Sequence, residues 1–117
     1  MKNKNFYQSV VCAFRGMKSG YLSERNFKIY TGIALFFLIL NILCSAGIYD
    51  YVILLALACF AFAMEYINTA IERVCDRFCE EPDREIGVIK DLGAAGVLFS
   101  GFAFFIGEGI VLIPKIL

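Results

Sequence analysis

Four polar side chains in the middle of the chain have the types and the spacing of a binding or catalytic site. They follow the apolar residues 51–64, and they are Glu65, Asn68, Glu72 and Asp76. Relative to the first of them, the others lie at offsets of 3, 7 and 11 residues, so on a helix all four fall within roughly 80° of one another. Because a carboxylate that faces hydrocarbon is costly, this polar stripe is predicted to face protein, water or a ligand.

The groups in and after the polar stripe are those that phosphoryl transfer requires. Carboxylate oxygens bind Mg²⁺, a metal ion and a lysine offset phosphate charge, and one carboxylate can take the proton from an attacking hydroxyl group. The lysine and a further acid follow at Lys90 and Asp91. Glu65 is nearest the apolar run, where a lipid hydroxyl group would arrive, whereas Glu72 and Asp76 are nearer the water, where ATP would arrive.

Two other functions would use the same residues. In an oligomer the stripe could conduct cations or protons, but acids would then continue across the membrane, and residues 51–64 contain none. The chain could also be a small non-catalytic membrane subunit, which would tolerate Glu65→Gln, whereas a kinase would lose its base. The sequence has no Walker A motif, no H-E-x-x-H and no G-x-S-x-G, which excludes several common nucleotide and hydrolase sites.

The composition is that of an integral membrane protein. The chain has 117 residues, of which 60% are hydrophobic, and a mean hydropathy of +0.72, whereas a soluble domain is about 45–50% apolar. Runs long enough to span a bilayer, which takes about 20 residues, are residues 29–48, 51–71 and 92–113. We therefore predict one all-α membrane domain over residues 1–117, with three transmembrane helices.

The basic residues lie in two parts of the chain. Six precede the first apolar run and four lie between the second and the third, whereas the short turn after the first run contains only Asp50 as a charged residue. By the positive-inside rule, the N-terminus and the second connection are cytoplasmic, and the short turn and the C-terminus lie outside. The net charge is zero, and no nucleic-acid partner is expected.

Residues 5–22 have apolar side chains at near-helical spacing, with basic residues elsewhere, which predicts an amphipathic helix on the membrane surface. This helix could lie on the membrane without a further role, or it could cover the polar stripe from the cytoplasmic side. Gly16 and Gly20 would weaken the helix or permit close approach to a neighbour.

Some polar residues near the ends of the helices have a structural explanation. Ser23 is predicted to cap the first transmembrane helix, where Glu24 either complements the helix dipole or belongs to the site, and periodicity alone leaves both open. Asn41 is expected to form a hydrogen bond with a neighbouring helix. The second helix should continue past residue 71 until Pro82 stops it. Glu108 is expected near the outer surface, with its side chain snorkelling toward the water.

The sequence resembles the bacterial integral-membrane diacylglycerol kinases from about residue 6 to the end. The matching segments are E-x-x-N-T-A-I-E-x-x-x-D from Glu65 to Asp76, K-D-x-G-x-A-x-V-L from Lys90, A-F-R-G at residues 13–16 and S-E-R-N-F at residues 23–27. Members of that family are small three-span homotrimers, unrelated to soluble kinases, in which neighbouring subunits share active sites. The resemblance implies an ATP-dependent kinase of a membrane lipid alcohol in the bacterial cytoplasmic membrane, with its active site on the cytoplasmic side.

The resemblance also implies a role for each matching residue. Glu65 is similar to the general base that acts on the lipid hydroxyl group, and Asn68 to a residue that supports this base and places the substrate. Glu24 and Glu72 match carboxylates that hold the Mg²⁺ bridging the phosphates of ATP, which favours a site role for Glu24.

Nucleotide-binding positions of the family match Asp76, Lys90 and Asp91. The surface helix and Glu24 would close over the site.

The chain departs from the family pattern in two places. It lacks the histidine often found in the loop before the Lys-Asp pair, and Tyr30 stands where relatives often have histidine or an acid. The segments S-E-R-N-F-K-I-Y and A-F-R-G look more like the undecaprenol kinase branch than the diacylglycerol-specific branch. Undecaprenol is therefore the expected substrate and diacylglycerol the alternative.

Overall fold

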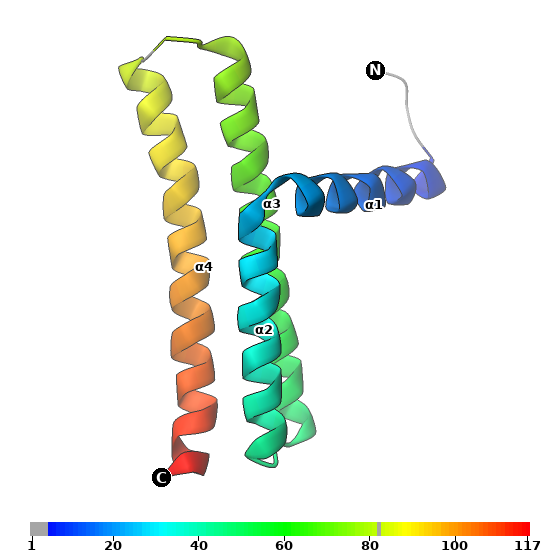
Figure 1. Ribbon diagram of the computed structural model, residues 1–117, viewed down its shortest axis with the longest axis vertical. Coiled ribbons are helices and arrows are strands. Elements are labelled where there is room, and N and C mark those ends of the chain that lie inside the picture. The colour runs from blue at the N-terminus through cyan, green and yellow to red at the C-terminus, as the bar shows by residue number, and fades with distance from the viewer. Residues whose placement is uncertain (1–4, 82) are drawn as a thin grey trace.

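The computed structural model describes residues 5–81 and 83–117, and all of its secondary structure there is helical (Figure 1). The helices are α1 (Phe6–Ser23), α2 (Arg25–Leu43), α3 (Ile48–Phe78) and α4 (Arg84–Ile116). Within this described part of the chain, α2, α3 and α4 are each long and apolar enough to cross a membrane. The predicted all-α architecture with three spanning helices is thus confirmed at the level of helix number, length and composition.

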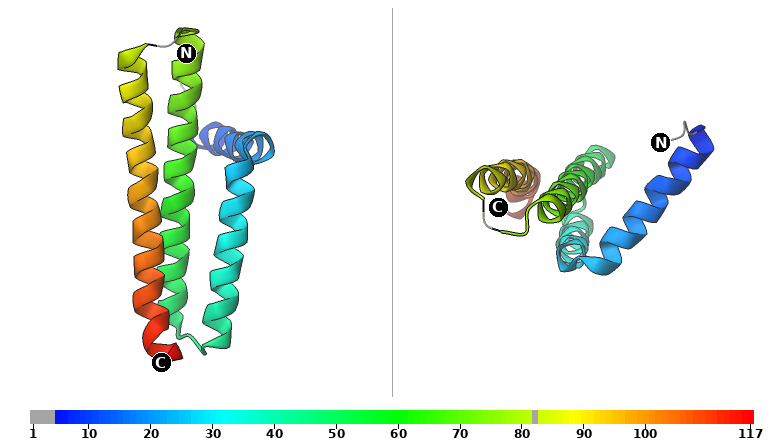
Figure 2. Two further views of the ribbon diagram at one scale, coloured as in Figure 1. Left: turned by 60° about the vertical axis from the view of Figure 1, so that its left-hand side comes forward. Right: turned by 90° about the horizontal axis from the view of Figure 1, so that it is seen from above.

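The three long helices run side by side, and α1 lies across them (Figures 1 and 2). Helix α3 packs against both α4 and α2, whereas the backbones of α2 and α4 come close over fewer residues, and Phe37 of α2 packs against Phe104 and Phe105 of α4. Both α3 and α4 continue beyond the level of α1 and are joined at that end of the molecule (Figure 1). Helix α3 therefore extends past residue 71 as predicted, and it ends at Phe78; Pro82 lies outside the described residues.

The bundle is apolar on its outside and partly polar on its inside. Leu35, Phe36 and Ile39 of α2 are more than half exposed. The buried side chains, by contrast, include the polar and charged residues Asn41, Glu65, Asn68, Ser100 and Glu108. In a membrane, lipid or neighbouring subunits cover such outer faces, and polar groups are directed to the interior of the bundle.

The turn between α2 and α3 lies earlier than the sequence predicted. The first apolar run was predicted to span residues 29–48, but α2 ends at Leu43 and Ile48 already begins α3. The chain reverses at Ser45, whose φ of 57° places it in the left-handed region. Gly47 then donates its backbone N–H to Asp50 Oδ2 at 3.0 Å, which caps α3. Hydropathy does not register this turn because the residues around it are apolar as well.

The prediction that Ser23 caps α2 is wrong. Ser23 is the last residue of α1, and its hydroxyl group donates to the carbonyl oxygen of Ser19 at 2.8 Å, a bond that serine commonly makes within helices. Glu24 is the N-cap residue of α2, with an extended backbone and no side-chain capping bond. The carboxylate of Glu24 is therefore available for other contacts.

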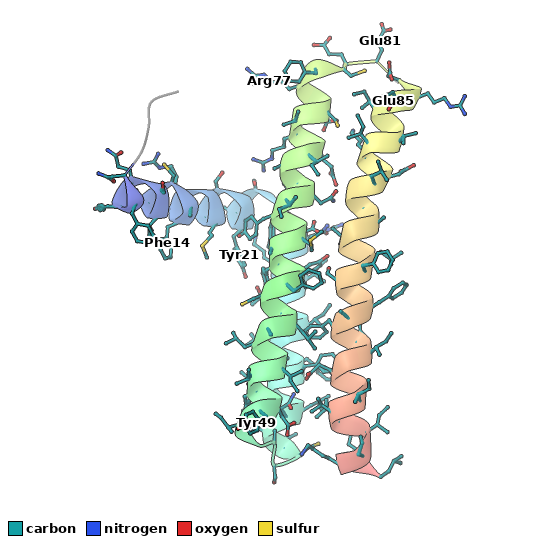
Figure 3. The ribbon with its side chains drawn as sticks, turned by 180° about the vertical axis from the view of Figure 1, so that it is seen from behind. Phe14, Tyr21, Tyr49, Arg77, Glu81 and Glu85 are labelled. Carbon is teal, nitrogen blue, oxygen red and sulfur yellow. The ribbon has the colours of Figure 1, made fainter. Side chains whose placement is uncertain are left out.

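Helix α1 leaves apolar side chains uncovered. Phe6 and Phe14 are both largely exposed. In Figure 3, Phe14 points from α1 toward the end of the bundle where Tyr49 lies, whereas Arg77 and Glu81 lie beyond α1 on the opposite side. This direction fits a helix that lies on a membrane surface with its apolar side toward the hydrocarbon.

Tyr66 of α3 attaches α1 to the bundle. Its hydroxyl group donates to the carbonyl oxygen of Met17 at 2.8 Å, and its ring stacks on Phe27 with 4.0 Å between the ring centroids. Gly20 is buried against the same ring, because a Cβ atom there would lie 2.6 Å from Tyr66 Cε1. Close approach is therefore the role of Gly20, whereas a Cβ atom at Gly16 would meet nothing within 4 Å.

We expect Gly20→Val to displace α1 from the bundle. The new side chain would collide with the Tyr66 ring, and overpacking of this kind costs about 1–3 kcal/mol. A cost of about 1–3 kcal/mol corresponds to a roughly 5- to 150-fold change in the equilibrium between attached and detached α1, so limited proteolysis between α1 and α2 should accelerate by up to about that factor. Gly16→Val is the matched control, since its side chain enters open space. Equal cleavage rates for the two variants would contradict this view of the junction.

Candidate active site

The polar stripe follows one side of α3, and its burial changes along the helix. Glu65 and Asn68 are buried, with 5% and 7% of their surface exposed, whereas Glu72 and Asp76 are exposed. Their order along the helix thus agrees with the predicted passage from an apolar to an aqueous environment. Glu65 lies at the buried end of the stripe and Asp76 at the exposed end.

Two residues of α2 hold the carboxylate of Glu65. Asn26 Nδ2 donates to Glu65 Oε1, and the hydroxyl group of Tyr30 donates to Glu65 Oε2, both at 3.1 Å. Asn26 and Tyr30 are four residues apart and share a face of α2. Sequence reasoning did not select either as a site residue, although Tyr30 stood out as a departure from the family pattern. Both donors are neutral, so they orient the carboxylate and leave other lone pairs free to accept a proton.

Asn68 contacts Glu72 instead of Glu65. Its Nδ2 donates to Glu72 Oε1 at 2.7 Å, and its Oδ1 is buried without a hydrogen-bond partner among the described residues. A Cβ atom at Gly93 of α4 would collide with this oxygen, so Gly93 makes room for the Asn68 side chain. The support of Glu65 that the family resemblance implied for Asn68 is provided in this structure by donors from α2.

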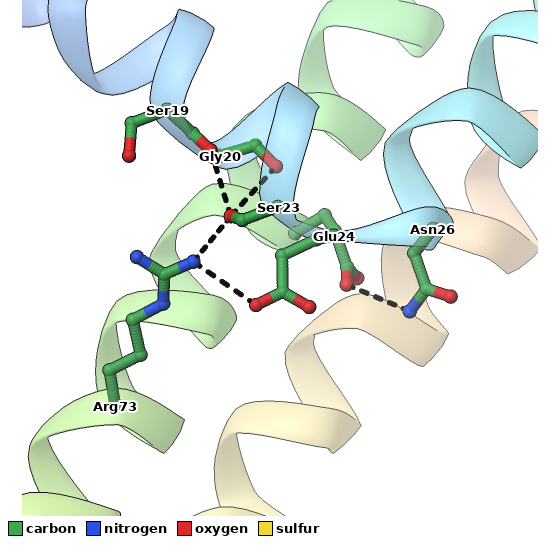
Figure 4. A network of polar contacts seen from close by, with 7 residues as sticks. Ser19, Gly20, Ser23, Glu24, Asn26 and Arg73 are labelled. Carbon is green, nitrogen blue, oxygen red and sulfur yellow. Dashed lines mark hydrogen bonds and ion pairs between the residues drawn. The ribbon is translucent and has the colours of Figure 1, made fainter.

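Glu24 forms an ion pair with a residue that the sequence analysis did not include in the site. Arg73 Nη2 lies 3.1 Å from Glu24 Oε1 and donates to Ser23 Oγ at 2.7 Å (Figure 4). Both side chains are about half exposed, at 52% for Arg73 and 41% for Glu24, and such pairs contribute only about 0–1 kcal/mol. Arg73 directly follows Glu72, so this contact places Glu24 beside the turn of α3 that carries Glu72.

The exposed end of the stripe contains a second ion pair. Lys90 Nζ lies 2.5 Å from Asp76 Oδ1. Lys90 precedes the apolar run of α4, and its hydrogen bond with Asp76 raises the pKa of the lysine above its ordinary value, so the ammonium group stays protonated. Asp91 is exposed and makes no side-chain hydrogen bond or ion pair within the described part of the chain.

The structure does not gather the acids into one closed metal site. Among the described residues, no group of three or more His, Cys, Asp or Glu side chains could hold a metal ion. Mg²⁺, however, is usually bound through one or two carboxylates together with substrate phosphates and water. Glu24 and Glu72 supply two hard carboxylates next to the same turn of α3, and this donor set fits a magnesium ion that is bound together with ATP.

A small apolar cavity lies between α2, α3 and α4, and Tyr30 connects it to Glu65. Its volume is about 100 Å³, and its lining comes from α2, α3 and α4, including Tyr30, Phe62 and Phe104. Because Tyr30 both lines the cavity and donates to Glu65, the carboxylate lies at the boundary between an apolar space and the exposed acids.

Comparison with known proteins assigns this arrangement to a family. Residues 11–112, most of the chain, match the pattern of the prokaryotic diacylglycerol kinases. The chain belongs to the prokaryotic diacylglycerol kinase family. This kinase is 30% identical over 112 residues to the undecaprenol kinase of Bacillus subtilis, covering 95% of this chain and 90% of the relative. It is 28% identical over 114 residues to the diacylglycerol kinase of Synechocystis, covering 97% of this chain and 65% of the relative.

The family and both relatives make the protein an enzyme, namely a lipid kinase that uses ATP. Together with the three apolar helices, the family also makes it a membrane protein. The two relatives are named for different lipids, and the chain is similar to both to nearly the same degree.

Proposed function

We propose that this kinase transfers the γ-phosphoryl group of ATP to the hydroxyl group of undecaprenol, forming undecaprenyl phosphate and ADP. The observation that carries the proposal is the arrangement of α3, in which a buried carboxylate beside an apolar cavity leads to exposed, charged residues. The chain covers 90% of the relative named undecaprenol kinase and 65% of the relative named diacylglycerol kinase, and this supports undecaprenol over diacylglycerol.

In the proposed mechanism Glu65 is the general base. Its carboxylate accepts the proton of the lipid hydroxyl group while the oxygen attacks the γ-phosphorus and the bond to the ADP oxygen breaks. Asn26 and Tyr30 keep the carboxylate oriented during this step. The apolar cavity accommodates part of the lipid next to the hydroxyl group.

Glu24 and Glu72 would hold Mg²⁺ through their carboxylate oxygens. When bound, the ion supplies positive charge that offsets the phosphates of ATP. Glu24 must leave Arg73 to do so, and the weak, exposed ion pair permits this. Lys90 contributes a permanent positive charge for the phosphates, and Asp76 and Asp91 contribute acceptors for the nucleotide.

The proposal also covers the orientation of the chain in the membrane and its assembly with other chains. The distribution of basic residues supports a cytoplasmic N-terminus and a cytoplasmic α3–α4 connection, and the exposed end of the stripe would then lie on the side where ATP is present. We infer that three chains assemble in the bacterial cytoplasmic membrane and share their sites. The uncovered apolar faces of the helices support this assembly.

The decisive experiment measures ATP-dependent phosphate transfer in mixed micelles that contain either undecaprenol or diacylglycerol. We expect transfer to both lipids, with the larger kcat/KM for undecaprenol. A larger kcat/KM for diacylglycerol would overturn the substrate assignment. Absence of transfer to either lipid from folded protein with Mg²⁺ would overturn both assignments.

We expect Tyr30→Phe to reduce the kcat for lipid phosphorylation by about tenfold and to leave the KM for ATP unchanged. The variant loses one of the two hydrogen bonds that orient Glu65, and a bond to a charged group contributes about 1.5–3 kcal/mol. Tyr49→Phe is the control, because Tyr49 is exposed at the far end of the bundle. A change in the KM for ATP at constant kcat would place Tyr30 in the nucleotide site instead.

A further inference from the structure

A second polar pair is buried far from the proposed site, between α2 and α4. Asn41 and Glu108 are both completely buried, at 0% exposed surface, and Asn41 Nδ2 donates to Glu108 Oε1 at 2.8 Å. The predicted hydrogen bond between Asn41 and another helix is confirmed. The expectation that the Glu108 side chain snorkels to water is wrong, because Glu108 is buried and shares its side of α4 with the buried residues Phe104 and Leu112, one turn away in each direction.

The buried polar atoms of this pair include two acceptors that have no hydrogen-bond donor between them. Asn41 Nδ2 also donates to the carbonyl oxygen of Phe37 at 2.8 Å, so both hydrogens of the amide are used. Asn41 Oδ1 and Glu108 Oε2 are both buried and without a partner among the described residues. A carboxylate oxygen and an amide oxygen are both acceptors. A single proton on the carboxyl group would satisfy both atoms at once.

An ionised Glu108 would also lack a balancing charge. In the described part of the chain no ion pair involves Glu108. Lys115, further along the same helix, is 3.1 Å from Asp50 and is already neutralised there. An unpaired charge inside a membrane bundle is among the most costly arrangements a protein can have, and such groups are normally paired or neutral.

We propose that Glu108 is a neutral carboxylic acid that donates its proton from Oε2 to Asn41 Oδ1. The acid and the amide then form a closed pair with two hydrogen bonds, one in each direction, and this pair joins α2 to α4. One turn before Asn41, the ring of Phe37 packs against Phe104 and Phe105 of α4. The Asn41–Glu108 pair therefore adds a polar link next to an apolar contact between α2 and α4. Glu108 is thereby a proton-holding residue outside the catalytic machinery, and the proposal does not depend on the assigned substrate.

Infrared spectroscopy of the full-length protein in lipid at neutral pH tests the protonation directly. The difference spectrum between wild type and Glu108→Gln should contain the carbonyl band of a protonated carboxylic acid, because all other carboxyl groups cancel. A difference spectrum that contains carboxylate bands and no protonated-acid band would overturn the proposal. This readout does not require kinase activity, so failure of the proposed function leaves it unaffected.

Thermal unfolding in the same lipid provides a second, independent test. Glutamine is the neutral isostere of the protonated acid and can make both hydrogen bonds to Asn41, so Glu108→Gln should keep the Tm of wild type. Glu108→Leu leaves the amide oxygen and one amide hydrogen of Asn41 unpaired, and the Tm should fall by about 5 °C. Asn41→Leu together with Glu108→Leu removes both polar partners and should recover much of that loss.

If Glu108→Gln lowers the Tm as much as Glu108→Leu, the proposal is overturned. If Glu108→Gln does not fold, the Asn41→Leu/Glu108→Leu double variant replaces it in the infrared difference spectrum, which must again contain the protonated-acid band of wild type.

Discussion

Glu65→Gln is expected to reduce phosphate transfer to lipid by roughly 10²–10⁴-fold, the usual contribution of general base catalysis. Glutamine has nearly the same shape, and its amide oxygen can still accept a hydrogen bond from α2, so the bundle should fold normally. What it lacks is the capacity to accept the proton of the lipid hydroxyl group. The loss should therefore appear in kcat, with little change in the KM for ATP.

This experiment has a matched control in the same chain. Glu81 is an exposed acid in the connection between α3 and α4, and Glu81→Gln removes the same charge without touching the buried end of the stripe. Binding of a non-hydrolysable ATP analogue should be equal in both variants and in wild type. If Glu65→Gln retains full activity, another group takes the proton and the proposed mechanism is wrong.

Glu24→Gln and Glu72→Gln are expected to raise the Mg²⁺ concentration needed for half-maximal activity by at least about 10–100-fold. Even groups that only support metal ligands change metal affinity by this factor when they are removed, and an amide is a weaker ligand than a carboxylate. Binding of Mn²⁺ in the presence of a non-hydrolysable ATP analogue should weaken in parallel, which separates loss of metal from loss of chemistry.

Glu85→Gln is the control for these two variants, since Glu85 is exposed in the first turn of α4, next to the α3–α4 connection (Figure 3), whereas Glu24 is the N-cap residue of α2. Unchanged metal dependence in both Glu24→Gln and Glu72→Gln would refute their assignment as magnesium ligands. Weakening in only one of them would leave one protein carboxylate on the ion, which is still within the usual coordination of Mg²⁺.

Much of the fold follows from the sequence because it depends on properties of single segments. The apolar runs are long enough to span a membrane, and this alone predicts α2, α3 and α4. Likewise, the polar stripe is a periodic feature of one helix. Its gradual change from the buried Glu65 to the exposed Asp76 could be predicted without any knowledge of its neighbours.

Hydrogen-bond partners that lie on different helices could not be predicted in this way. Asn26 and Tyr30 contact Glu65 only because α2 and α3 pack in one particular rotation and register, and periodicity within a segment does not contain this information. Arg73 was overlooked because exposed arginines are common near the cytoplasmic ends of spanning helices. The burial of Glu108 was missed because its partner Asn41 is 67 residues away in the chain.

Helix α3 is uninterrupted over its 31 residues from Ile48 to Phe78. At about 1.5 Å per residue, Glu65 lies about 26 Å along the helix from Ile48, the first residue of α3. This distance is close to the roughly 30 Å thickness of a bilayer's hydrocarbon layer. The depth of the base is therefore coupled to the lipid in which the helix lies. A thicker membrane would draw the carboxylate away from the nucleotide, and a thinner one would let water compete with the lipid hydroxyl group for the phosphoryl group. If Glu65 is the base, as proposed, we therefore expect the ratio of lipid phosphorylation to wasteful ATP hydrolysis to depend on acyl-chain length.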